Sequence, residues 1–169
     1  ITFGSSSAWA IQNGLVKEQV FVDSSAARNR GPVKRKNYED RGSGGRGGSG
    51  ILLADIDITN PIGYGLTSRQ LFVNKIGNTI LNPSKNEFAT VAQFTGKPHI
   101  SGFISYEIVN NLSNKAAILI GQHGQGSVVL FAEDPTYRHH WHGTDRLFTN
   151  AIFFGDRLRT QGRFGMQAE

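Results

Sequence analysis

The chain has 169 residues, 38% of them hydrophobic, which suits one domain with or without a disordered insert. The absence of cysteine excludes disulfide bonds, thiolate metal ligands and a cysteine nucleophile from this sequence. The net charge of +5 and the pI of about 9.7 invite a nucleic-acid-binding interpretation.

The distribution of the charge argues against that interpretation. Residues 28–46 contain seven basic and two acidic residues, out of totals of 18 and 13 for the chain. The rest of the chain therefore has 11 residues of each sign and is balanced. We predict that nucleic acid is not a partner of the domain core.

The chain begins at Ile1, inside a predicted strand, rather than at a methionine. We interpret it as a fragment of a longer protein whose amino-terminal signals, if it has any, lie outside this sequence. It has neither a charged start followed by an apolar stretch nor a run of about 18 apolar residues. We therefore predict no signal peptide and no membrane span in it.

An α/β pattern opens the chain in its first unit, residues 1–22. Residues 1–3 are predicted to form a short strand, and the small residues 4–7 a turn that can cap a helix. Residues 8–12 should be a short helix that Asn13 and Gly14 close with a left-handed cap. Strand, small-residue turn and helix in this order are typical of α/β folds.

Residues 23–50 are predicted to be a flexible, basic, glycine-rich loop. This polar stretch cannot bury enough apolar surface to offset the entropy lost on ordering. Arg41 and Arg46 lie among glycines, as in RNA-binding arginine–glycine segments, but no aromatic residue is interleaved. We favour a solvated linker, with polyanion binding as the alternative.

Residues 51–155 are predicted to be the domain core. Apolar runs and alternating patterns predict strands separated by turns, with one short helix. The predicted strands are residues 51–58, 71–73, 79–81, 88–94, 116–120 and 128–131, and the helix is residues 105–112. The last two strands should form a hairpin with a wide, glycine-rich connection at residues 121–126.

An amphipathic helix is predicted at residues 144–154. Leu147, Ala151 and Phe154 recur on one helical face, and Thr144 and Gly155 suit its two ends. The polar tail, residues 156–169, is expected to fray.

Three stretches of the sequence carry a resemblance to a known family. They read ITFGSSSAWAI with NGL after it (residues 1–15), ADID followed by NPIGYG (54–65), and GQGSVVLFAEDPTYR continuing through WHGT to LFTNAIFFG (124–155). Together they resemble the carboxy-terminal class I glutamine amidotransferase-like domain of secreted zinc carboxypeptidases, chiefly of the Bacteroidetes type. The resemblance covers most of the chain except the basic loop and the tail.

The resemblance implies a fold, a parent protein and a location. The fold would be a partial flavodoxin-like mixed sheet with flanking helices, from which the amino-terminal half is missing. A zinc peptidase domain would lie upstream in the same chain and would be the partner of this domain. The location would be secreted or periplasmic, and no cofactor is expected in this sequence itself.

The resemblance also indicates where amidotransferase chemistry would lie. The family places a catalytic cysteine on a strand-to-helix elbow, matched here by Ser6, and a catalytic histidine after a late strand, matched by Ala132. A serine needs a base, and alanine cannot accept a proton. We predict no catalysis by this chain. The alternative is a serine hydrolase or amidohydrolase that uses Ser6.

Three histidines, His139, His140 and His142, surround Trp141 and are the candidate metal ligands, because closely spaced histidines often bind metals. The other two histidines are distant in sequence, and no carboxylate lies at a recognised spacing. We predict surface or packing roles for the three and no metal site.

Five further residues are assigned binding or structural roles: Asp55, Glu133, Asp134, Arg138 and Trp141. We expect Arg138 to be buried and to form a bidentate ion pair with an acid such as Asp134 or Asp55. The alternative for Arg138 is an anion ligand in a cleft at the strand ends.

The sequence as a whole favours a non-catalytic accessory domain of a zinc metallocarboxypeptidase-like protein. Its role would be packing against the peptidase domain, oligomerisation or substrate holding. The apolar surface left exposed by the missing half of the sheet should make the chain associate with itself.

Overall fold

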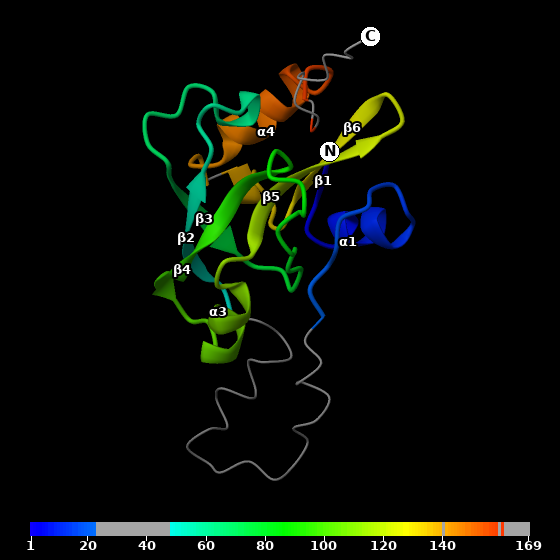
Figure 1. Ribbon diagram of the computed structural model, residues 1–169. Coiled ribbons are helices and arrows are strands. Elements are labelled where there is room, and N and C mark those ends of the chain that lie inside the picture. Colours follow the sequence, from blue (N-terminus) through cyan, green and yellow to red (C-terminus); the bar gives the residue numbers. More distant parts are fainter. Residues whose placement is uncertain (23–47, 140, 159, 161–169) are drawn as a thin grey trace.

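The computed structural model describes residues 1–22, 48–139, 141–158 and 160 (Figure 1). These residues form a curled, six-stranded mixed sheet with few helices, so the predicted α/β class is confirmed. The strands are β1 (Thr2–Phe3), β2 (Gly50–Ile56), β3 (Gln70–Lys75), β4 (Thr90–Gly102), β5 (Ala116–His123) and β6 (Gly126–Phe131). The helices are α1 (Ser5–Gln12), α3 (Tyr106–Leu112) and α4 (Asp145–Phe153), with short 3-10 turns η2 (Pro61–Gly63) and η3 (Tyr137–His139).

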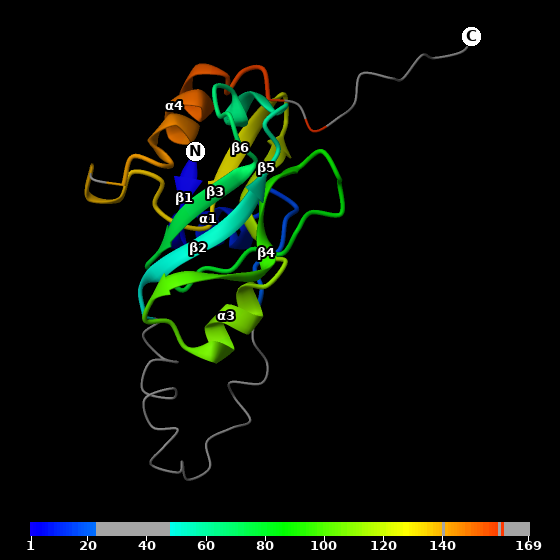
Figure 2. The same ribbon diagram turned by 90° about the vertical axis from the view of Figure 1, so that its left-hand side faces the viewer.

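The strands follow the order β1-β6-β5-β4-β2-β3 across the sheet. β1 pairs in parallel with β6, and the other four neighbouring pairs in the described sheet are antiparallel. Strand twist accumulates across such a sheet, and the sheet curls visibly in both views (Figures 1 and 2).

Residue alternation explains the burial of the strands. In β2, Leu52, Ala54 and Ile56 are fully buried, whereas Asp55 between them is exposed. In β5, by contrast, every residue from Ala116 to Gly121 is buried. A central strand that is covered on both faces reads as a continuous apolar run, as this one does.

Apolar clusters cover both faces of the sheet, because successive strand residues point to opposite sides. On one face, Ile118 and Ile120 of β5 belong to the cluster that includes Leu147 of α4. On the other face, Leu119 belongs to the cluster that includes Ala10 of α1. Helices α1 and α4 therefore pack on opposite faces of the sheet (Figure 1).

Two predicted strands differ from the structure. β4 continues to Gly102, well beyond the predicted end at residue 94. Residues 79–81 do not form a regular strand; within the described chain, Leu81 makes isolated bridges to Val20 and Ala116.

The connection between β5 and β6 is tighter than predicted. The two strands pair as far as His123 and Gly126, which leaves a two-residue turn at Gly124 and Gln125. Gly124 has φ 55, as the first residue of a tight hairpin turn requires.

The predicted basic loop lies mostly outside the described residues, at 23–47, as do His140, residue 159 and residues 161–169 of the tail. In the part of the chain that is described, no helix has the length and apolar character needed to cross a membrane.

Candidate functional site

The junction of β1 and α1 is a sharp strand-to-helix turn made by one residue, Gly4. Gly4 has φ 56 and ψ −128, a conformation that strains residues other than glycine. Helix α1 begins directly after it, at Ser5. A nucleophile elbow presents its reactive side chain from the residue at such a strained turn. The elbow position of this structure is therefore Gly4, which has no side chain.

Ser6, the position matched to the nucleophile by sequence, lies in the first turn of α1 and is exposed. Among the described residues, no hydrogen bond joins its hydroxyl to a histidine or a carboxylate. Its neighbour Ser7 is fully buried and donates from Oγ to the carbonyl oxygen of Phe131 at 2.8 Å. Ser7 Oγ also lies 3.0 Å from Oγ1 of Thr2. Ser7 rather than Ser6 therefore fixes the start of the helix on the sheet.

Ala132, the position matched to the catalytic histidine, lies next to the elbow. The Gly4 N–H donates to the carbonyl oxygen of Phe131 at 3.0 Å, and Ala132 follows Phe131 directly. Ala132 is 1% exposed and belongs to the apolar cluster on the α1 face. The fold thus brings the two positions together, and neither Gly4 nor Ala132 has a group that can attack a carbonyl or accept a proton.

Glu133 anchors a buried ion pair with Lys75, whose side chain is 1% exposed against 4% for Glu133. The second carboxylate oxygen of Glu133 accepts the backbone N–H groups of Ile76 at 2.9 Å and Gly77 at 2.8 Å. Lys75 Nζ also donates to the carbonyl oxygen of Gly77. Because Lys75 ends the edge strand β3 and Glu133 follows β6, the pair connects one edge of the curled sheet to the strand next to its opposite edge.

The role of Lys75 was not predicted from the sequence. Lysine is rarely buried without a partner, and this partner is 58 residues away along the chain. The one available signal was position: Lys75 falls on the same side of β3 as the buried residues Leu71 and Val73.

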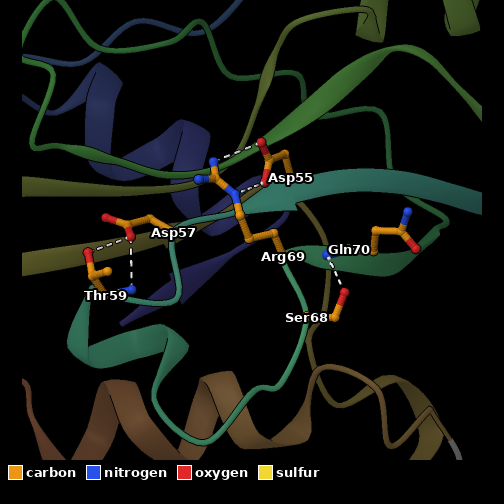
Figure 3. Close-up of polar contacts among 6 residues, drawn as sticks. All are labelled: Asp55, Asp57, Thr59, Ser68, Arg69 and Gln70. Carbon is orange, nitrogen blue, oxygen red and sulfur yellow. Dashed lines mark hydrogen bonds and ion pairs between the residues drawn. The ribbon is translucent and has the colours of Figure 1, made fainter.

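Asp55 forms an exposed bidentate ion pair with Arg69 (Figure 3). Both contacts, Nε to Oδ1 and the terminal nitrogen to Oδ2, measure 2.9 Å. The hydrogen bond and then the charge of Asp55 raise the pKa of Arg69 above its usual value. Nearby, Asp57 accepts from the backbone N–H of Thr59 at 2.9 Å and from its hydroxyl at 2.6 Å. Both carboxylates therefore stabilise local contacts on the surface of the protein.

The ion pair predicted for Arg138 is not formed. Arg138 is exposed, adopts φ 52, and its guanidinium lies 5.3 Å from the centre of the Tyr137 ring. Asp134 accepts instead from the backbone N–H and the hydroxyl of Thr136, at 2.9 and 3.1 Å. The expectation of a buried Arg138 held by Asp134 or Asp55 is wrong, because a left-handed turn directs this residue to solvent.

The candidate metal ligands do not assemble into a site within the described residues. His139 is exposed, and His142 Nδ1 lies 2.8 Å from Oδ2 of Asp145 in the first turn of α4. His140 lies outside the described residues. In the described chain, no group of three or more histidine and acidic side chains is arranged to hold a metal ion.

Trp141 is hydrogen-bonded to the edge strand β3. Its Nε1 donates to the carbonyl oxygen of Phe72 in β3 at 3.2 Å. Further along the third matched stretch, the Asn150 amide donates to the carbonyl oxygens of Ile62 and Tyr64 at 2.8 and 2.9 Å. The second and third of the matched stretches therefore contact each other, just as the first and third do through β1 and β6.

Comparisons with protein-family models, curated proteins and solved structures find no match to this chain. We therefore infer its function from the residues and contacts described above.

Proposed function

We propose that this chain is a non-catalytic accessory domain of the class I glutamine amidotransferase-like type, from a secreted or periplasmic zinc metallocarboxypeptidase-like protein. The resemblance of three sequence stretches suggests the parent, in which zinc would belong to an upstream peptidase domain. The observation that carries the loss of catalysis is the glycine at the strand-to-helix elbow. An elbow works by holding a nucleophile beside helix N–H donors, and Gly4 supplies no nucleophile.

The position matched to the catalytic histidine supports the same conclusion. Ala132 is adjacent to the elbow and packs in an apolar cluster. A serine hydroxyl at Ser6 would therefore receive no help from this position, although it needs a base to become a nucleophile. Gly4 at the elbow and Ala132 at the histidine position together favour a domain that has kept the amidotransferase-like fold and lost the catalytic residues.

The proposal includes a partial flavodoxin-like sheet that lacks its amino-terminal half. The parallel pairing of β1 with β6, and the helix directly after β1, support this assignment. The antiparallel pairs restrict it to a mixed variant of such a sheet. In the described sheet β1 is an edge strand, and the missing strands would add there.

The surface near β1 supports a role in packing, oligomerisation or substrate holding. Ile1, Phe3 and Trp9 are 46%, 40% and 58% exposed around this edge. Large exposed apolar side chains on an edge strand and on the helix that follows it favour coverage by another domain or another chain.

Labelling with a fluorophosphonate probe tests the loss of catalysis. We expect no adduct on Ser6 when the chain is incubated with the probe and mapped by mass spectrometry, because the hydroxyl is exposed and unactivated. Ser6→Ala is the matched control. A stoichiometric adduct on Ser6 that disappears in Ser6→Ala would contradict the proposal and support a serine hydrolase.

A further inference from the structure

We propose that a cleft beside the end of β5 binds a small organic anion that has an apolar part. The cleft has a volume of about 600 Å³, which falls within the usual range for small-molecule sites. It is bordered by four parts of the chain that are far apart in sequence, and its lining includes Lys17, Glu18, Pro83, Ser84, Lys85 and Thr160.

Hydrogen bonds join the walls of this cleft. Ser84 Oγ donates to Oε1 of Glu18 at 3.0 Å, across 66 residues of sequence. The side-chain amide of Asn86 donates to the carbonyl oxygen of Thr160 at 2.7 Å. Walls that are fastened to each other need little rearrangement on binding, and this lowers the entropic cost of holding a ligand.

Part of the cleft lining is apolar and open to solvent. Pro83 lines the cleft and is exposed, whereas Ala89 and Ile120, also in the lining, are each 1% exposed and have almost no surface left to cover. An aromatic ring or short alkyl chain placed against Pro83 would remove apolar surface from water, which favours binding.

The charges of the lining select an anion. Lys17 and Lys85 are exposed, and within the described residues neither ammonium has a hydrogen-bond or ion-pair partner. The carboxylate of Glu18 is the opposing charge, and it already accepts the hydroxyl of Ser84. Two ammonium groups against one carboxylate attract a carboxylate or phosphate group and repel a cation.

This cleft shares no residue with the elbow or with Ala132. The inference therefore does not rest on the proposed function, and either can fail without the other.

Phenyl phosphate combines an apolar ring with an anion and is the probe of choice. We expect the whole chain to bind it saturably at one site in isothermal titration calorimetry. The double variant Lys17→Gln/Lys85→Gln should raise the Kd about tenfold, because two charge interactions are lost. Lys97→Gln, which removes an exposed lysine of β4 outside the cleft, should bind as the wild type does.

Two further titrations separate the contributions of ring and charge. Phenol lacks the anion and inorganic phosphate lacks the ring, so each should bind more weakly than phenyl phosphate. Circular dichroism establishes that the variants are folded. The proposal is overturned if phenyl phosphate shows no saturable binding at millimolar concentrations, if the double variant binds like the wild type, or if Lys97→Gln weakens binding equally.

Discussion

Gly4 combines a positive φ with open space where a side chain would point. In the described part of the chain, no atom lies within 4 Å of a Cβ built at this position. The backbone conformation, and not packing, therefore sets the cost of any substitution here. For a residue other than glycine this conformation costs on the order of 1–3 kcal/mol.

We expect Gly4→Ala to lower the free energy of unfolding by about 1–3 kcal/mol, measured by urea denaturation. Gly126→Ala is the matched control, because Gly126 does not have a positive φ and its nearest neighbour would lie 3.6 Å from the new Cβ. That variant should be as stable as the wild type or slightly more so. Equal losses in both variants would show that Gly4 is not strained.

The ion pair of Lys75 and Glu133 predicts a second large effect at single residues. Glu133→Ala should cost about 3–5 kcal/mol, because it leaves a buried ammonium without its partner. The exposed Asp55 is the control: Asp55→Ala, which breaks the surface pair with Arg69, should cost far less. Urea denaturation of the two variants measures the difference.

A double variant separates the loss of the charge pair from the loss of the hydrogen bonds that Glu133 accepts. Lys75→Met combined with Glu133→Gln should be more stable than Glu133→Ala, because no buried ammonium is left and the amide oxygen still accepts from Ile76 and Gly77. A surface-like effect of Glu133→Ala would contradict the burial of the pair.

At the scale of elements, α1 is attached to the sheet through the side chain of Ser7. Its buried hydroxyl bonds to the carbonyl oxygen of Phe131 and contacts Thr2, so it joins β1, β6 and α1. We expect Ser7→Ala to lower the free energy of unfolding by about 1–3 kcal/mol. Ser6→Ala, one residue away and exposed, should change it by less than about 0.5 kcal/mol. Chemical denaturation of both variants tests this, and a larger effect for Ser6→Ala would contradict it.

Elements with a strong local pattern could be predicted from the sequence, and those formed by distant pairing could not. The alternation in β2 and the continuous apolar run of β5 predicted those strands correctly. The second half of β4 contains Gly96 and Pro98, which disfavour a strand locally. It is extended because Ser101 and Gly102 pair with the start of β2.

The candidate site was predicted less well, for a similar reason. The resemblance matched the nucleophile position to Ser6, but the strand-to-helix turn is made by Gly4, because its position depends on where β1 ends. Whether the side chains of Lys75 and Arg138 are buried or exposed depends on the direction of the backbone at the end of an element. The residue type does not determine that direction. Lys75 is buried and paired, whereas Arg138 turns outward.

At the scale of the whole molecule, the edge of the sheet at β1 is short and has exposed apolar side chains. β1 pairs over two residues with β6, and Ile1, Phe3 and Trp9 are exposed around it. This edge lies close to α4 and away from α3 (Figure 2), and the rings of Phe3 and Phe148 are 6.4 Å apart. The surface near β1 is therefore well suited to contact another protein surface.

We expect the chain to associate with itself as its concentration rises, because this apolar edge is uncovered. Sedimentation velocity measures the association. Trp9→Lys should reduce it, whereas Tyr106→Lys, at a residue 79% exposed on α3, should not. A monomer at all concentrations, or equal effects of the two substitutions, would contradict this expectation.

The hydrogen bonds from two backbone N–H groups to Glu133 also affect the rate at which those amide hydrogens exchange with solvent. Ile76 and Gly77 lie just past the end of β3, where amide hydrogens usually exchange with deuterium quickly. Here they are hydrogen-bonded to Glu133, which is itself buried and follows β6 across the sheet, so we expect them to be released when β3 separates from β6. Their exchange rates should therefore match those of the central strand β5 and report the opening of the entire fold.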